Sequence, residues 1–314
     1  MPLDMPSART DLDMQGGLSR PLSVLTWNVS YEPLQPLGVL PWEQRRERIA
    51  DAVRDADIIA LQELSGRQLH DLQQSLAGFE VVTLRIPLPE ELHRVLSTRY
   101  RVTLERDIGE LALFVRTTRL EIVEQRHQWL SPTPEVPLSI GWGNVVPRLL
   151  LWCLLRDRSR GADFVVAATH VDLTAVRPML AAIRDGLAES VARIGAGILL
   201  GDLNTMADPD AFDALLDAGW HDTHSSGDLA VDPTFLGELA GRPGRIDHIL
   251  VYGHAAATGW RRASAARDGL SDHLAVRAEV LLREDVRPDP LPKHCEPGPA
   301  SKSSRHERTT LTER

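Results

Sequence analysis

The pattern of hydrophobic and polar positions predicts a series of short buried strands. Leu22 to Asn28 and Asp57 to Gln62 are apolar runs of the length that a strand in a covered sheet requires. Similar runs recur as far as residue 282. The further predicted strands are Phe79 to Leu84, Leu111 to Arg116, Leu120 to Gln128, Arg148 to Arg156, Phe164 to Thr169, Ile198 to Gly201, Arg245 to Tyr252 and Leu274 to Leu282.

Helical periodicity separates some of these strands. Trp42 to Ala56 is predicted as a helix that carries Ile49, Ala52 and Val53 on one face, with Arg and Glu residues on the other. Further helices are predicted over Gly66 to Ala77, Val176 to Arg193 and Pro209 to Ala218.

The order of these elements indicates the fold class. Between Leu111 and Thr169 several strands follow one another without a helix, which does not suit a purely doubly wound parallel sheet. We therefore expect an α/β fold, a four-layer α-β-β-α sandwich in which two mixed sheets stack and helices cover them on the outside.

The two ends of the chain differ in composition from its body. Residues 1–20 are polar, and residues 284–314 are first rich in Pro and then in Ser, Lys, Arg and Glu. Such segments bury too little apolar surface to fold, so both are expected to be disordered around a folded body at residues 21–283. The N-terminal segment lacks the apolar centre of a signal peptide, and Leu149 to Leu155 is too short to span a bilayer. These features favour a cytoplasmic protein without a membrane span.

Charge and cysteine content narrow the classes of partner. The formal net charge is −9, and no Lys or Arg occurs between Ile194 and Gly241. Because a protein that holds long nucleic acid normally presents a basic stripe, a small phosphorylated substrate is favoured over a duplex. Only two cysteines, Cys153 and Cys295, occur, which excludes a disulfide framework and a cysteine-based zinc site. The oligomeric state is not predicted.

Polar residues stand where three predicted strands end. Asn28 closes the first strand, Glu63 follows the second, and Asp202 follows Gly201. A carboxylate at the end of a buried strand is costly unless it is paired or bound to a metal. Asp202 and Asn204 alternate onto one side of an extended segment, and Mg²⁺ or Mn²⁺ prefers such oxygen ligands. Taken singly, each of these residues could instead be an ordinary turn or loop residue.

Two histidines and one further aspartate extend this group. His170 ends an apolar run, and His273 follows Asp272. Each could be a hydrogen-bonded core histidine, but two of them among carboxylates favour acid–base work or phosphate contact. Asp247 alternates into a predicted strand and would be costly there without a partner. A histidine is a suitable partner, because a carboxylate fixes its tautomer and raises its basicity.

Six short motifs occur in an order that is typical of one superfamily. They are Thr-Trp-Asn, Leu-Gln-Glu, Ala-Thr-His, Gly-Asp-Leu-Asn, Arg-Ile-Asp-His and Ser-Asp-His. Together they resemble the endonuclease/exonuclease/phosphatase superfamily over Leu22 to about Leu282. The resemblance implies the same four-layer sandwich and a catalytic domain at residues 21–283. The stretch from Trp129 to Arg148 further resembles a bacterial subgroup of metal-dependent hydrolases that often have no assigned substrate.

The resemblance also implies a role for each matching residue. Asn28, Glu63 and Asp272 would bind a catalytic Mg²⁺ or Mn²⁺. Asp202 would orient or activate the attacking water, and Asn204 would contact the scissile phosphate or a second ion.

The remaining motif residues would act on the phosphate. His273, held by Asp247, would hydrogen-bond one phosphate oxygen, and His170 would contact the opposite oxygen or assist the leaving group. Glu110 matches an acidic residue that precedes the middle strand of many members.

Arginine residues supply candidates for substrate contact. The segment from Arg85 to Arg106 is longer than the subgroup usually has, and it contains Arg94 and Arg99. Arginine is suited to bidentate phosphate contacts, so these two residues and Arg148 are candidate substrate ligands. A solvated insertion is the competing interpretation of the segment. The leading prediction is a metal-dependent phosphoester hydrolase, with a nuclease or a non-catalytic binding protein as alternatives.

Overall fold

Two six-stranded mixed sheets form the body of the protein. The computed structural model describes residues 20–34, 36–87, 90, 93–94, 97–98, 107–108, 110–237, 243–263 and 268–283. The first sheet has the strand order β13-β14-β1-β2-β6-β3, and the second has the order β11-β12-β10-β9-β8-β7. The predicted disordered ends lie outside the described residues except for Arg20, and the boundaries at residues 20 and 284 stay a prediction.

The strands agree closely with the hydrophobic pattern. The first sheet contains β1 (Leu22–Asn28), β2 (Ile58–Gln62), β3 (Phe79–Thr83), β6 (Leu111–Arg116), β13 (Ala255–Arg262) and β14 (Val276–Leu282). The second sheet contains β7 (Leu120–Trp129), β8 (Leu149–Asp157), β9 (Ala162–His170), β10 (Ala196–Asp202), β11 (Trp220–Asp222) and β12 (Asp247–Gly253). A separate pair joins β4 (Ile86–Pro87) to β5 (Asp107–Ile108). The sequence analysis did not predict strand β13, because its residues are mostly small or polar and show no alternation of apolar and polar positions.

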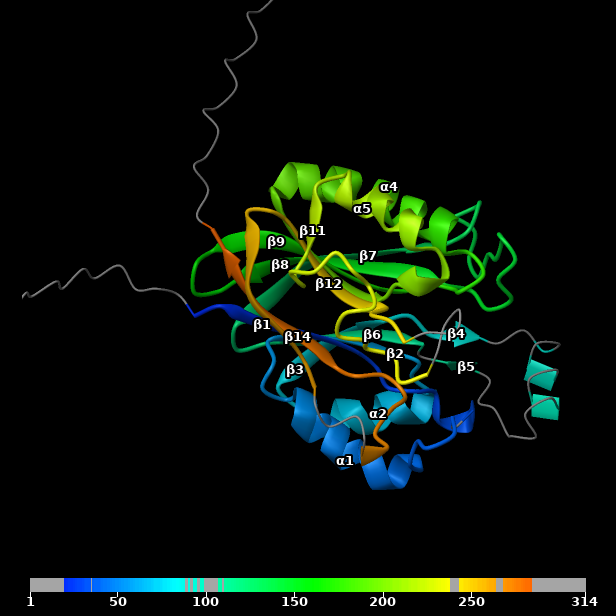
Figure 1. Ribbon diagram of the computed structural model, residues 1–314. Coiled ribbons are helices and arrows are strands. Elements are labelled where there is room, and N and C mark those ends of the chain that lie inside the picture. Colours follow the sequence, from blue (N-terminus) through cyan, green and yellow to red (C-terminus); the bar gives the residue numbers. More distant parts are fainter. Residues whose placement is uncertain are drawn as a thin grey trace, which may run out of the picture. The chain divides into compact units, whose positions relative to one another are not determined.

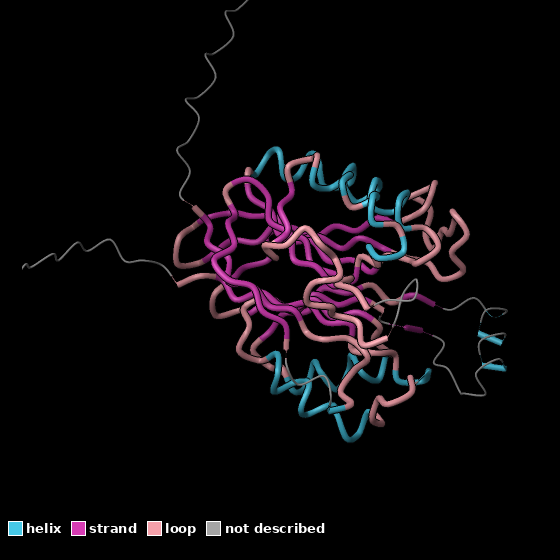
Figure 2. The backbone as a smooth tube through the Cα atoms, in the orientation of Figure 1, coloured by secondary structure: helices cyan, strands magenta, loops and turns pink. Residues whose placement is uncertain are grey.

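Helices cover the outer face of each sheet, as predicted for a four-layer sandwich (Figure 1). Helices α1 (Trp42–Val53) and α2 (Gly66–Ser75) pack on the first sheet. Helices α4 (Val176–Ile194) and α5 (Asp213–Leu216) cover the second sheet. Figure 2 shows the strands as two central layers between the helices. Among the described residues, no helix combines the length and the apolar character that crossing a bilayer requires.

Two details of the helix predictions were wrong. In α1 the buried face contains Ala50 rather than Ala52, and it also contains Arg45, which is fully buried. The expected helix over Pro209 to Ala218 is instead the 3-10 turn η3 (Pro209–Ala211) followed by the short α5. Further 3-10 turns are η1 (Glu32–Leu34) and η2 (Thr205–Ala207).

Because side chains alternate along each strand, they divide between a central core and one core beneath the helices of each sheet. Val24 of β1, Ile58 of β2 and Ile198 of β10 point between the sheets, where they form the central core. Their neighbours Leu25 and Ile59 point outward beneath the helices of the first sheet. Because the period is two residues, any polar residue in step with the central core must also lie between the sheets.

Candidate active site

The alternation brings the predicted polar residues to one edge of the inter-sheet space. Asn28 is in step with Val24, and Asp202 is in step with Ile198, so both point between the sheets. In the second sheet Asp202 pairs in register with His170 on one side and with Asp247 on the other. Residues opposite each other on adjacent strands point to the same face. The second sheet therefore presents a buried row of His170, Asp202 and Asp247.

Asp202 lies at the centre of the site. Its Oδ2 is 3.6 Å from Nε2 of His170 and 3.8 Å from Nε2 of His273. The same oxygen accepts a hydrogen bond of 3.2 Å from the Asn28 amide, which crosses from the first sheet. Burial raises the pKa of Asp202, and the nearby carboxylate of Asp247 adds to the rise. The side chain is therefore not the solvated turn residue that the tetrapeptide alone allowed.

Asn28 also holds Glu63. Its Nδ2 donates to Oε1 of Glu63 at 3.0 Å, and the backbone N–H of Tyr31 donates to Oε2 at 3.1 Å. Burial acts to raise the pKa of Glu63, but the charge of His170 and these hydrogen bonds outweigh it and lower the pKa. Glu63 has φ of 57°, in the left-handed region, so the chain turns at this residue.

His273 forms a buried pair with Asp247. Its Nδ1 is 2.9 Å from Oδ2 of Asp247, as the family resemblance implied, and Nε2 faces Asp202. Burial acts to lower the pKa of His273, but Asp247 outweighs it and raises the pKa to about 10. The backbone N–H of Asp247 donates to the hydroxyl of Thr234 at 3.0 Å, which fixes the start of β12. A carboxylate in this position sets the tautomer and the orientation of the ring.

His170 has a matching partner in Glu110. Its Nδ1 is 2.6 Å from Oε1 of Glu110, and Nη1 of Arg148 donates to the same oxygen. Burial and the charge of Arg148 act to lower the pKa of His170, but Glu110 outweighs them and raises the pKa. Asp202 therefore lies between two histidines, and a carboxylate orients each histidine from behind.

The donor chemistry fits a divalent cation. Single ligand atoms of Asp202, Asp247 and His273 all lie within 4.8 Å of one another. Oδ1 of Asp247 and Oε2 of Glu110 are buried without a hydrogen-bond partner, and a buried unpaired carboxylate oxygen calls for a cation. None of these three residues is among the predicted metal ligands Asn28, Glu63 and Asp272. Asn28 connects the two groups, because it donates hydrogen bonds to both Glu63 and Asp202.

The other predicted site residues differ in their placement. Asn204 is buried, has φ of 49° and uses its Nδ2 to bind the carbonyl of Val171 at 2.7 Å. Asp272 is partly buried, and its backbone carbonyl accepts the N–H of Leu236 at 2.9 Å. Arg148 reaches Glu110 inside the site, whereas Arg94 is exposed. Arg99 lies outside the described residues.

Sequence reasoning missed the residues that join the loops of the site. The hydroxyl of Ser271 donates to the carbonyl of Asn28 at 2.6 Å, and the indole N–H of Trp27 donates to the carbonyl of His273 at 3.0 Å. Both bonds tie the end of β1 to the loop before β14. Arg45 contacts the same two segments. Its place between Trp42 and Ile49, at helical spacing on the buried face, was the one signal that the sequence offered.

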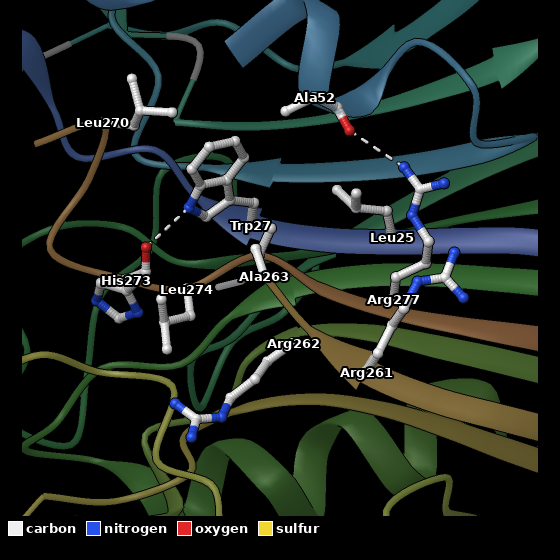
Figure 3. A pocket seen from close by; sticks show the side chains of 11 residues that line it. Leu25, Trp27, Ala52, Arg261, Arg262, Ala263, Leu270, His273, Leu274 and Arg277 are labelled. Carbon is white, nitrogen blue, oxygen red and sulfur yellow. Dashed lines mark hydrogen bonds between the residues drawn. The ribbon is translucent and has the colours of Figure 1, made fainter. Parts of the chain in front are cut away.

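A small pocket adjoins the site without being part of it (Figure 3). It has a volume of about 140 Å³ and is lined by Leu25, Trp27 and Leu270 among other residues. Leu25 and Trp27 point to the face of β1 opposite to Asn28, and the backbone carbonyl of His273 is turned toward the Trp27 indole (Figure 3). The chemistry therefore lies on the other face of the strand.

Comparison with solved structures finds the same architecture in bacterial and human proteins. A Bacteroides vulgatus endonuclease/exonuclease/phosphatase is 22% identical and superimposes with a TM-score of 0.68 over 83% of this chain and 99% of that chain. A Bacteroides thetaiotaomicron mannosyl-6-phosphatase is 25% identical, with a TM-score of 0.62 over 83% and 99%. The human Nocturnin catalytic domain with bound sulfate is 17% identical, with a TM-score of 0.65 over 83% and 93%.

Sequence comparison gives the family directly. No curated protein matches this chain. The model of the endonuclease/exonuclease/phosphatase family matches residues 25–273, which span every site residue from Asn28 to His273. The chain belongs to the endonuclease/exonuclease/phosphatase family.

Proposed function

We propose that this protein is a Mg²⁺- or Mn²⁺-dependent hydrolase that cleaves a phosphoester of a small substrate by in-line attack of water. One observation carries the proposal, namely the buried Asp202 between two histidines that are each paired with a carboxylate. Such an arrangement is costly for folding and useful for managing protons around a phosphate. The family name joins nucleases with phosphatases, both of which hydrolyse phosphoesters.

The residues divide the work according to their placement. Asn28, Glu63 and Asp272 would hold the metal. A bound divalent ion supplies positive charge that offsets the charge of the phosphate and the leaving oxygen.

The groups around Asp202 would handle the water and the phosphate oxygens. Asp202 would orient the attacking water and accept its proton. His273 and His170 would donate their Nε2 protons to phosphate oxygens, because the carboxylate beside Nδ1 raises the pKa of each ring and favours the form that is protonated on both nitrogens. Asn204 would contribute a further contact to the phosphate, and Arg148 would add positive charge beside His170.

A small substrate is favoured over nucleic acid on charge. The stretch between Ile194 and Gly241, which includes Asp202 and Asn204, contains no Lys or Arg. The structural neighbour that is called a mannosyl-6-phosphatase supports the same choice. Arg94 and Arg99 remain proposed substrate contacts, and a cytoplasmic location belongs to the proposal. A nuclease is the alternative, because the family also includes nucleases.

Metal removal and two variants test the chemistry. Turnover of a chromogenic phosphoester should be lost in EDTA and return with Mg²⁺ or Mn²⁺. Asp202→Asn and His170→Ala should abolish turnover while circular dichroism stays native. Asp185→Asn is the control, because this exposed carboxylate lies on α4 and pairs with the neighbouring Arg184. Near-normal turnover in either site variant would remove the role assigned to that residue.

A substrate panel separates the alternatives. Sugar phosphates, a phosphoinositide, sphingomyelin, plasmid DNA and RNA should be compared at two salt concentrations. Preference for a small phosphoester supports the proposal, whereas cleavage of DNA or RNA with binding that falls steeply as salt rises supports a nuclease. Failure of the wild-type protein to bind Mg²⁺ or Mn²⁺ in calorimetry would favour a non-catalytic binding protein.

A further inference from the structure

Arg45 is a buried cation that no role described so far uses. It lies in α1, its side chain is fully buried, and its guanidinium stacks near the Trp42 ring at 5.3 Å. Burial lowers the pKa of Arg45 to about 10, while Glu32, Asp272 and Glu63 act in the opposite direction. Arginine is rarely fully buried without a specific set of acceptors.

The acceptors of Arg45 are backbone carbonyls on the two loops that carry the proposed metal ligands. Nη2 donates to the carbonyl of Ser30 at 2.8 Å, and Nη1 donates to the carbonyl of Leu270 at 2.9 Å. Nη1 also donates to the carbonyl of Val29. Val29 follows Asn28 directly, and Leu270 precedes Asp272 by two residues. One rigid fork thus joins the end of β1 to the loop before β14.

Other bonds between these segments are local, whereas Arg45 adds a connection to the helix layer. Ser271 and Trp27 tie the two segments directly to each other, as the dashed bond from Trp27 to His273 illustrates (Figure 3). Arg45 fixes both segments to α1, which itself packs on the first sheet. Its planar group presents Nη1 and Nη2 at a fixed separation, which an ammonium cannot reproduce.

We propose that Arg45 is a positioning residue that sets the distance between Asn28 and Asp272 and thereby the affinity of the site for a divalent cation. The inference rests on the proposed metal-dependent function. The positive charge of Arg45 opposes cation binding, whereas its hydrogen bonds favour the geometry of the site, so the two effects act in opposite directions. A test must therefore hold the charge constant.

The Arg45→Lys variant holds the charge constant, because lysine keeps the positive charge but offers a single nitrogen. Calorimetric titration of the metal-free protein with Mn²⁺ should give a Kd at least fivefold weaker than that of the wild type. Excess Mn²⁺ should then restore much of the lost kcat, which a general loss of stability would not produce. Arg48→Lys is the matched control, because Arg48 also joins α1 to this loop, through an exposed ion pair of 3.0 Å with Asp268. Its Kd should stay within twofold of the wild-type value.

The outcomes separate this inference from the proposed function. A folded Arg45→Lys protein that binds Mn²⁺ within twofold of the wild type would refute the positioning role. Arg45→Gln, which keeps a short N–H donor, is the second variant, and it should bind Mn²⁺ at least fivefold more weakly than the wild type. Loss of the native circular dichroism spectrum in both variants would make Arg45 a folding residue and would also overturn the inference. Absence of Mn²⁺ binding by the wild type would instead overturn the metal-dependent function itself.

Discussion

The pair of Asp247 and His273 allows a quantitative prediction. Asp247→Asn keeps the shape of the side chain but removes the charge 2.9 Å from Nδ1 of His273. A hydrogen bond to a charged group contributes about 1.5–3 kcal/mol and a neutral one about 0.5–1.5 kcal/mol, so the variant should lose about 1–2 kcal/mol. If that energy orients His273 in the transition state, kcat/KM should fall about 5- to 30-fold. Loss of a carboxylate that orients a metal-site histidine typically lowers activity or metal affinity by about 10- to 100-fold, which overlaps this range.

The assay is a double-mutant cycle on a chromogenic phosphoester with Mn²⁺. Asp247→Asn should have almost no further effect when His273 is already alanine, because Asp247 acts through that ring. Independent effects of the two substitutions, or a single-variant loss below twofold, would refute the reasoning.

A second aspartate–histidine pair provides the matched control for this cycle. His248 follows Asp247 in β12 and points to the opposite face of the sheet, where its Nδ1 is 3.0 Å from Oδ2 of Asp222. The geometry of the pair is similar, but it lies away from Asp202. Asp222→Asn should therefore leave kcat/KM within about threefold of the wild type, a spread of about 0.7 kcal/mol.

Two further predictions concern the support of the site, and a third concerns the stability of the fold. Glu110→Gln should lower kcat/KM about 10- to 100-fold by releasing His170, whereas Glu80→Gln on the exposed side of β3 should not. Gly201→Ala should destabilise the protein by about 1–3 kcal/mol in urea unfolding, because the new Cβ would lie 2.2 Å from the carbonyl oxygen of Thr169; an unchanged midpoint would contradict this. Burial acts to raise the pKa of Asp222, but His248 outweighs it and holds the pKa below the ordinary 3.8, so its stabilising contribution is present above pH 3.8 and is lost as pH falls through the lower folded pKa. The melting temperature of Asp222→Asn should consequently be lower than that of the wild type at pH 7, and the difference should shrink below pH 3.8.

The sequence by itself determined the strands and most of the polar residues at their ends. Leu22–Asn28 and Leu111–Arg116 are strands with the predicted bounds, because apolar runs of this length can be buried only in a covered sheet. The same alternation predicted that Asp202 and Asn204 share one side of their segment and that Asp247 needs a histidine partner, whereas the choice of His273 as that partner came from the family resemblance. Local periodicity is sufficient for the placement of these side chains, since it fixes which face each side chain occupies.

Only the tertiary structure decided which of these residues meet. The hydrogen bond from Asn28 to Asp202 crosses from one sheet to the other, and the pairing of Glu110 with His170 joins residues that are distant in the chain. Arg45 looked like a surface residue of an amphipathic helix, yet it is buried, and loop carbonyls from two distant segments accept hydrogen bonds from its Nη1 and Nη2. Contacts of this kind depend on how sheets and loops stack in space, and the pattern along the chain contains no record of that stacking.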